Sequence, residues 1–280
     1  MSGPFLLARM LRLLAMVALG FALFQAASPA ATAEEEVLLN LTFDDRKVDE
    51  DLTAEWRFFA QGSETTEGLT AAQAKREGAK FIVKTDPADP NNKVLWLAGG
   101  DTLLDDAFIY MPSLNNPEIN KGNYGAIQLD FYTDPELKKA GPKKILKRAG
   151  PYRIGVFGFI DPDDTVSYGA WMRWSDRQVR VGRLVAGQED ATRSVKLGRR
   201  SNCGRWYTIR AEFKREGGQL AIIGKMWERA KGSARAVRVS KTVPLSAKKT
   251  FAIGIYQYTC SEKFNYDKRF IDNLKVFRPE

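Results

Sequence analysis

The chain contains no histidine among its 280 residues, and this absence excludes whole classes of chemistry. Ser-His-Asp and Cys-His catalysis both need an imidazole as general base, and most transition-metal sites use histidine as a ligand. Lyase mechanisms that depend on an imidazole are excluded for the same reason. An enzyme built on this chain would therefore have to work with carboxylates, tyrosine or lysine.

Cysteine is scarce as well, because Cys203 and Cys260 are the only two in the sequence. Two thiolates without histidine are too few ligands for a zinc site, and we expect neither a metal nor a cofactor. In an exported protein an even number of cysteines favours a disulfide. Each cysteine lies beside a predicted strand, so we expect one bond that joins neighbouring strands.

Long apolar runs are absent beyond residue 33, which predicts no membrane span in the rest of the chain. Before that point, Arg9 and Arg12 precede an apolar run over residues 13–24, and small residues at 31–33 follow it. This is the pattern of a signal peptide. The alternative is an uncleaved N-terminal anchor, but the run has only about half the length of a membrane span. We expect a secreted or periplasmic protein whose residues 1–33 are removed.

The net charge of +9 is spread along the chain rather than gathered in one block. A basic exported protein can meet acidic polysaccharide, anionic lipid or nucleic acid. Export and the lack of an aromatic-basic recognition motif argue against nucleic acid. The one local cluster surrounds Gly141-Pro142 and is interpreted as a solvated loop; it contains Lys138, Lys139, Lys143, Lys144, Lys147 and Arg148.

Short β-prone segments separated by turn residues recur from residue 37 to residue 277. The segment 124–133 shows the period of a half-buried strand, with Ile127, Leu129 and Phe131 on one face. The best helix candidate is the short segment 70–77, which Gly78 ends. No linker and no repeat divides residues 34–280. We therefore expect one all-β domain, a two-sheet antiparallel jelly-roll sandwich with one short helix in an early loop.

The two ends of this domain have the same character. Residues 37–45 and residues 269–277 are both short β-prone runs with acidic or amide residues beside their apolar positions. We expect these two segments to pair and to close the sandwich.

Four segments, taken in order, resemble the concanavalin A-like superfamily of laminin G domains, legume lectins and glucanases. They are residues 41–44 (LTFD), 86–95 (DPADPNNKVL), 206–209 (WYTI) and 270–276 (FIDNLKV). The resemblance spans nearly all of residues 34–280 and implies two curved antiparallel sheets with glycan bound on the concave face. Because the superfamily contains lectins, binding modules, hydrolases and lyases, the fold by itself does not choose the activity.

Hydrolases of this fold that resemble laminarinases carry Glu-x-Asp-x-Glu on one strand, where one glutamate is the nucleophile and the other is the acid. The corresponding segment here is Gln128-Leu129-Asp130-Phe131-Tyr132. Both glutamates are replaced, by Gln128 and Tyr132, which argues against this chemistry.

Lyases of this fold that resemble alginate lyases carry Gly-x-Tyr on a late strand. Gly254 and Tyr256 match this pattern, so the resemblance implies Tyr256 as the catalytic residue. The family's lysine and glutamine are replaced here by Ala252 and Tyr258, and its histidine is missing. The alternative is that Tyr256 and Tyr258 are ordinary strand aromatics.

Residues 167–175 contain the most promising binding side chains. Alternation places Trp171 and Arg173 on one face and Tyr168 and Trp174 on the other, and one of these faces belongs to the core. An exposed tryptophan beside an arginine can stack on a sugar ring and donate to its hydroxyl or carboxylate groups. The predicted carbohydrate-binding surface contains Gln128, Asp130, Tyr132, Arg153, Trp171, Arg173, Tyr256 and Tyr258.

Asp44 and Asp272 offer oxygen ligands for calcium if the terminal strands bring them together, but we expect them instead to bind backbone amides. Three hypotheses remain. The first is a non-catalytic polysaccharide-binding protein, with a ligand that can be acidic. The second is a polysaccharide lyase that acts on an acidic glycan through Tyr256. The third is a structural or adhesion module with a protein partner.

Overall fold

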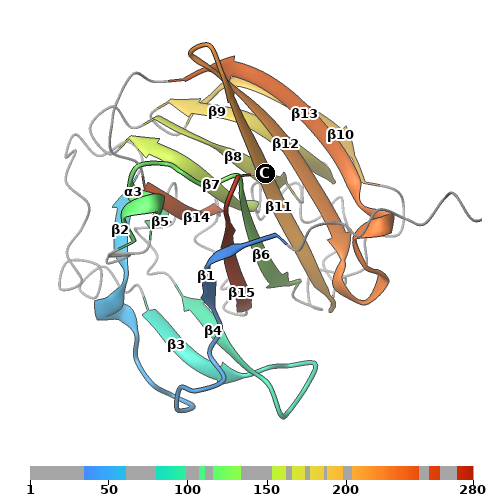
Figure 1. Cartoon of the computed structure of the whole chain (residues 1–280). Helices are drawn as coiled ribbons and strands as arrows, with labels where there is room; N and C mark the ends of the chain where they lie inside the picture. Colours follow the sequence, from blue (N-terminus) through green and yellow to red (C-terminus); the bar gives the residue numbers. More distant parts are fainter. Residues whose placement is uncertain are drawn as a thin grey trace, which may run out of the picture. The chain divides into compact units, whose positions relative to one another are not determined.

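Strands dominate the computed structural model, which describes residues 35–60, 80–98, 107–110, 116–133, 153–161, 166–173, 177–185, 188–197, 204–245, 252–258 and 270–279. The chain divides into one unit of Met1–Glu35 and a second of Glu36–Glu280, and the second holds both sheets. Every strand pair in these sheets is antiparallel, so the expected all-β sandwich is confirmed (Figure 1).

The first sheet, here sheet A, contains eight strands. Its order is β13 (Val237–Pro244), β12 (Gln219–Glu228), β11 (Trp206–Glu216), β6 (Ala126–Tyr132), β15 (Phe270–Phe277), β4 (Lys93–Ala98) and β3 (Lys80–Thr85), and β1 (Val37–Leu41) also pairs with β15.

The second sheet, here sheet B, contains seven strands. Its order is β10 (Gln188–Lys196), β9 (Gln178–Val185), β8 (Val166–Arg173), β7 (Arg153–Asp161), β14 (Ala252–Tyr258), β5 (Ala107–Tyr110) and β2 (Arg57–Ala60).

The helical turns in the described residues are short. They are η1 (Thr53–Glu55), α3 (Pro117–Asn120), η2 (Arg229–Lys231) and η3 (Ser233–Arg235). Helix α3 begins with Pro117 at its first position, and the Asn116 side chain accepts hydrogen bonds from two backbone amides of its first turn. The helix expected at residues 70–77 lies outside the described residues.

The two terminal segments pair as predicted. Strand β1 runs antiparallel to β15, with Val37 opposite Phe277 and Leu41 opposite Leu274. Strand β15 also pairs with β6 and β4, so the last strand of the chain lies inside sheet A. The two terminal strands therefore lie together in sheet A, whereas the strands within residues 153–196 belong to sheet B.

The core lies between the two sheets and follows the alternation of each strand. Ile127, Leu129 and Phe131 on β6 are fully buried, which confirms the face predicted for this segment. From sheet B, Val181 of β9 reaches the same core. The sheets approach closely here, because a Cβ added at Gly224 of β12 would lie 2.3 Å from Val181 Cγ1.

A buried hydrogen bond ties the start of sheet A to a bulge in sheet B. The backbone amide of Phe159 donates to the Tyr124 hydroxyl at 2.6 Å. Phe159 has a φ of 50°, and the register of β7 against β8 shifts between Gly158 and Asp161. Burial raises the pKa of Tyr124, so the phenol stays neutral and its oxygen stays an acceptor for this amide.

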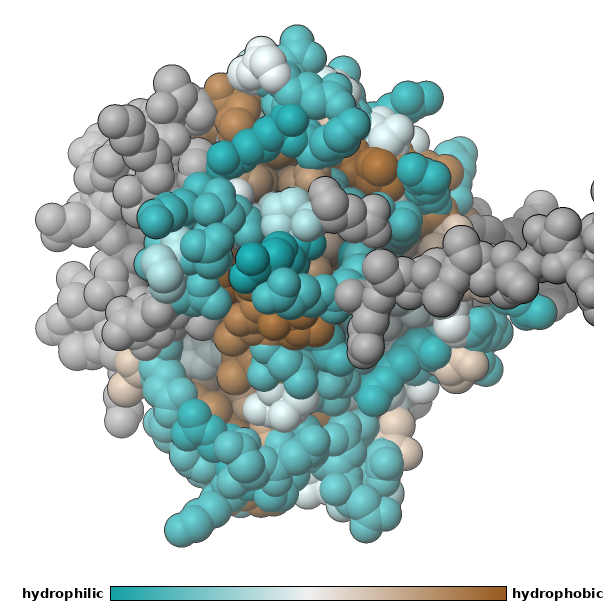
Figure 2. All heavy atoms as spheres, viewed as in Figure 1, coloured by the Kyte–Doolittle hydropathy of each residue, from teal (hydrophilic) through white to brown (hydrophobic). Residues whose placement is uncertain are grey.

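Figure 2 gives the surface in the same view: hydrophilic side chains cover most of the described part of this face, with hydrophobic ones between them. In the described ranges, no helix has the length and apolar character that a membrane crossing requires.

Candidate functional site

The structure divides the predicted carbohydrate-binding residues between the two sheets. Strand β6 belongs to sheet A, whereas β7, β8 and β14 belong to sheet B. The prediction of one surface that joins all eight residues is therefore wrong. The reason is that β6 and β7, although consecutive, lie in opposite layers. Sheet A holds Gln128, Asp130 and Tyr132; sheet B holds Arg153, Trp171, Arg173, Tyr256 and Tyr258.

In sheet B the strands that carry the predicted residues lie side by side. Backbone register places Arg153 of β7 between Tyr258 of β14 and Arg173 of β8. Two residues further along these strands, Gly155 lies between Tyr256 and Trp171 in the same way. The backbones of all five predicted residues in this sheet are thus neighbours across three strands.

The two faces of β8 are divided as the alternation predicted. Tyr168 is fully buried in the core between the sheets. Trp171 and Arg173 are therefore on the outer face of sheet B, away from that core. Trp174 lies outside the described residues.

Three arginines from three neighbouring strands gather around one glutamate on this outer face. Arg180 of β9 forms an ion pair with Glu189 Oε2 of β10. Arg153 Nη1 lies 3.5 Å and Arg173 Nη1 lies 3.9 Å from Glu189 Oε1. The four side chains are between 13% and 28% exposed, and Arg173 is the most accessible of them. We name these four residues the arginine cluster.

The arginine cluster explains how Arg153 and Arg173 can face each other. Like charges directly opposite on neighbouring strands repel, and a shared carboxylate offsets this repulsion. Sequence reasoning missed Arg180 and Glu189. Alternation alone would have placed Arg180 on one face with Gln178, which accepts from Arg180 Nε at 3.1 Å. No local signal marks Glu189, because its role depends on side chains of three other strands, β7, β8 and β9.

Trp171 does not present an exposed ring. Its side chain is fully buried and stacks on Phe157, with the ring centroids 5.4 Å apart and the planes at 26°. Ile160 and Leu184 complete this small apolar cluster, which is separate from the main core. Trp171 therefore belongs to a packed apolar cluster beside the arginine cluster, and its ring is not open for stacking on a sugar.

A glycine beside Trp171 allows this packing. A Cβ at Gly155 would lie 2.3 Å from the Ala170 carbonyl oxygen and 2.6 Å from Trp171 Cβ. Two side-chain oxygens on the same outer face, Ser167 Oγ and Glu189 Oε1, accept no hydrogen bond within the described part of the chain. A ligand or a water molecule can donate to either oxygen, and the Ser167 hydroxyl can also donate.

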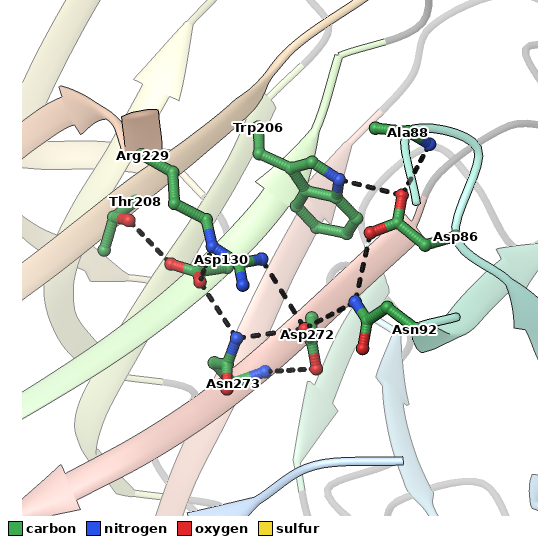
Figure 3. A network of polar contacts seen from close by, with 9 residues as sticks. All are labelled: Asp86, Ala88, Asn92, Asp130, Trp206, Thr208, Arg229, Asp272 and Asn273. Carbon is green, nitrogen blue, oxygen red and sulfur yellow. Dashed lines mark hydrogen bonds and ion pairs between the residues drawn. The ribbon is translucent and has the colours of Figure 1, made fainter. Parts of the chain in front are cut away.

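The outer face of sheet A carries a different polar network (Figure 3). Asp130 Oδ1 accepts a hydrogen bond of 2.6 Å from the Thr208 hydroxyl, and Asp130 Oδ2 accepts one of 3.1 Å from Asn273 Nδ2. Arg229 lies over both acids, 3.4 Å from Asp130 Oδ2 and 3.6 Å from Asp272 Oδ2. Burial raises the pKa of Asp130 and of Asp272 above the ordinary range for carboxyl groups, and Arg229 opposes this shift.

The same network reaches the turn between β3 and β4. Asn92 Nδ2 donates to Asp86 Oδ2 at 3.0 Å and to Asp272 Oδ2 at 3.3 Å. The Trp206 indole donates to Asp86 Oδ1 at 3.0 Å. These side chains bind one another across β6, β11, β15 and the turn, so the network holds the strands and the turn together.

The other predictions from the sequence concern the two candidate calcium ligands and the two cysteines. Asp272 Oδ1 accepts from the Asn273 backbone amide at 2.8 Å, as expected for a carboxylate at a strand end. Asp44 has an exposed side chain, and its carbonyl accepts from Lys93 Nζ at 2.7 Å. A search of the described residues finds no group of three or more acidic, cysteine or histidine side chains arranged to hold a metal ion. Cys203 and Cys260 lie outside these residues.

No protein-family model matches the chain, and no curated protein sequence matches it. Several solved structures are similar in fold. The endo-1,3-beta-glucanase from Streptomyces sioyaensis is 12% identical at a TM-score of 0.47, with 90% of this chain and 99% of that chain covered. Lectin II from Ulex europaeus is 10% identical at 0.43, with 87% and 98% covered. The carbohydrate binding module CBM66 from Bacillus subtilis is 12% identical at 0.36, with 71% and 88% covered. These three structures all have a concanavalin A-like jelly-roll fold.

Proposed function

We propose that this chain binds an acidic polysaccharide on the outer face of sheet B, where β7, β8, β9 and β10 lie side by side. The observation that carries the proposal is the arginine cluster, in which three guanidinium groups converge on Glu189. Guanidinium groups match carboxylate oxygens in geometry and charge, so the arrangement suits the carboxylate of a uronic acid.

The surroundings of the cluster support a sugar rather than a bare anion. Ser167 Oγ and Glu189 Oε1 accept no hydrogen bond from the described residues, which suits a ligand rich in hydroxyl groups. The stacked rings of Trp171 and Phe157 join β8 to β7, the two strands that carry Arg173 and Arg153. Export through a signal peptide at residues 1–33 is part of the same proposal and would expose the protein to extracellular or periplasmic polysaccharide.

A second candidate is a polysaccharide lyase, which the position of β14 favours. The backbone of Tyr256 is paired with Gly155, two residues along the strands from the pair of Tyr258 and Arg153. Arg153 could then neutralise a uronate carboxylate while a tyrosine transfers the proton of β-elimination. Release of unsaturated ends from a uronate polymer, abolished in Tyr256→Phe, would support this candidate, and its absence from every polymer that binds would reject it.

The test of binding is affinity electrophoresis of the mature protein through gels that contain neutral or acidic polysaccharides. We expect retardation by a polymer of uronic acids, persistence of part of it in high salt, and a loss of at least about tenfold in affinity in Arg173→Ala. The matched control is Lys121→Ala, which removes one exposed positive charge at the end of α3. Equal losses in both variants, or no retardation by any polysaccharide, would overturn the proposal.

A further inference from the structure

A second positively charged surface lies on the connection between β12 and β13, in sheet A. Residues 229–235 form this connection through η2 and η3, and all of them are exposed. In Figure 1 the connection is at the lower end of the two orange strands. We name as the basic patch the residues Arg205, Lys225, Lys231, Arg235 and Arg238.

The residues of the basic patch come from β12, from β13 and from the segments beside their ends. Lys225 of β12 is directly opposite Arg238 of β13, so their side chains share the outer face of sheet A. Arg235 ends η3, just before β13 begins. Arg205 precedes β11, and both Arg205 and Lys231 pair with Glu228 at the end of β12.

The cations of the basic patch outnumber the carboxylates beside it. Glu228 serves Arg205 and Lys231, and Glu212 accepts from Lys225 Nζ at 2.6 Å. Neither Arg235 nor Arg238 forms an ion pair with any of the described residues. Two of the five cations are thus exposed and unneutralised, and the side chains of Arg205, Lys231 and Lys225 are 46%, 41% and 31% exposed.

The composition of the connection restricts what can bind there. The exposed large hydrophobic residues among those described are Val37 and Val48, which belong to β1 and to the turn region after it. The basic patch therefore offers charge without apolar side chains to insert into a bilayer. The connection itself also contains no aromatic residue that could stack on the bases of a single-stranded nucleic acid.

We propose that the basic patch binds a linear polyanionic polysaccharide through its sulfate or carboxylate groups. Arginine predominates over lysine in the patch, and its fork of donors binds such groups with two parallel hydrogen bonds. The patch lies on sheet A and shares no residue with the arginine cluster of sheet B. This proposal therefore stands independently of the function proposed for sheet B.

The test uses the mature full-length protein and dextran sulfate, which carries sulfate but no carboxylate groups. Binding is measured by affinity electrophoresis at several salt concentrations for the wild type and for the double variant Arg235→Glu/Arg238→Glu. We expect the double variant to lose at least about tenfold in affinity. A plot of log affinity against log salt concentration has a negative slope. We expect the double variant to make this slope shallower by about 2, which is about 1 for each arginine replaced, by analogy with nucleic-acid binding.

The matched control is Lys47→Glu/Lys121→Glu, which changes the net charge by the same amount at exposed positions away from the patch. The proposal requires this control to keep most of the affinity. Equal losses in the two double variants would show diffuse attraction to net charge and would overturn it. Two further arms use anionic phosphatidylglycerol vesicles and a single-stranded oligonucleotide, and tighter patch-dependent binding to either than to dextran sulfate would also overturn it.

Discussion

Asp130 and Asp272 are directly opposite each other on the neighbouring strands β6 and β15. Two buried carboxylates in this position repel, and Arg229, which also lies 5.7 Å from the centre of the Trp206 ring, compensates both. The pair connects β6, β15 and the turn that carries Asn92, so its protonation is linked to the stability of sheet A.

The first prediction concerns the pH dependence of this pair. Burial raises the folded-state pKa of both acids above the ordinary value of 3.8. The folded state then binds more protons than the unfolded state between the ordinary and the raised pKa. The contribution of the pair to stability is therefore largest at low pH and falls as the pH rises through this interval.

Urea unfolding of the wild type and of Asp272→Asn from pH 4 to pH 7 measures this effect. The stability of the wild type relative to Asp272→Asn should fall as the pH rises. In an Arg229→Ala background the fall should extend to higher pH, because Arg229 lowers both pKa values. Asp44→Asn serves as the exposed control, and a difference that grows in favour of the wild type with pH would contradict the prediction.

The second prediction concerns the carboxylate at the centre of the arginine cluster. In Glu189→Gln the three guanidinium groups lose their shared negative partner, although the shape of the side chain is kept. We expect a loss of about 1–3 kcal/mol in the free energy of unfolding. The control is Glu216→Gln, whose ion pair with Lys214 is between exposed side chains, so this variant should change the free energy of unfolding much less than Glu189→Gln. Losses of equal size in these two variants would show that Glu189 does not organise the cluster.

The third prediction concerns the closest approach of the two sheets. In Gly224→Ala the new methyl group would overlap Val181 Cγ1, so we expect a destabilisation of about 1–3 kcal/mol in urea unfolding. Val181→Ala removes the overlapping atom. The double variant should therefore be more stable than the sum of the two single effects predicts. Additive losses would mean that the strands separate there without strain.

The fourth prediction concerns the bond between Tyr124 and the bulge in β7. Tyr124→Phe leaves the buried amide of Phe159 without its acceptor, at a cost of about 1–3 kcal/mol. Hydrogen exchange should show faster exchange of the Phe159 amide relative to the amides of Val156 and Phe157. Unchanged exchange at Phe159 would indicate that water or another group replaces the hydroxyl.

Much of the strand layout follows from local pattern. Alternation within residues 126–132 determines which side chains of β6 enter the core, and it separates Tyr168 from Trp171 on β8. The β-prone runs at both ends of the chain predicted the pairing of β1 with β15. The first feature follows from the alternation of side chains along a single strand, and the second follows from two β-prone runs at the ends of one domain. Both patterns can be recognised in the sequence.

The composition of the candidate site depended on tertiary structure. Alternation assigns a residue to one side of its strand, but it does not say in which sheet that strand lies. For this reason Asp130 belongs with Asp272 and Arg229 on sheet A, rather than with Arg153 on sheet B. For the same reason the role of Glu189 in the arginine cluster follows only from the strand order of sheet B, in which β10 is two strands from β8. The sequence by itself determined the faces of the strands, because that information is local. Only the arrangement of the strands in the two sheets decided which charged groups meet, because the groups of each ion-pair network lie on separate strands, and the neighbours of a strand are not a local property of the sequence.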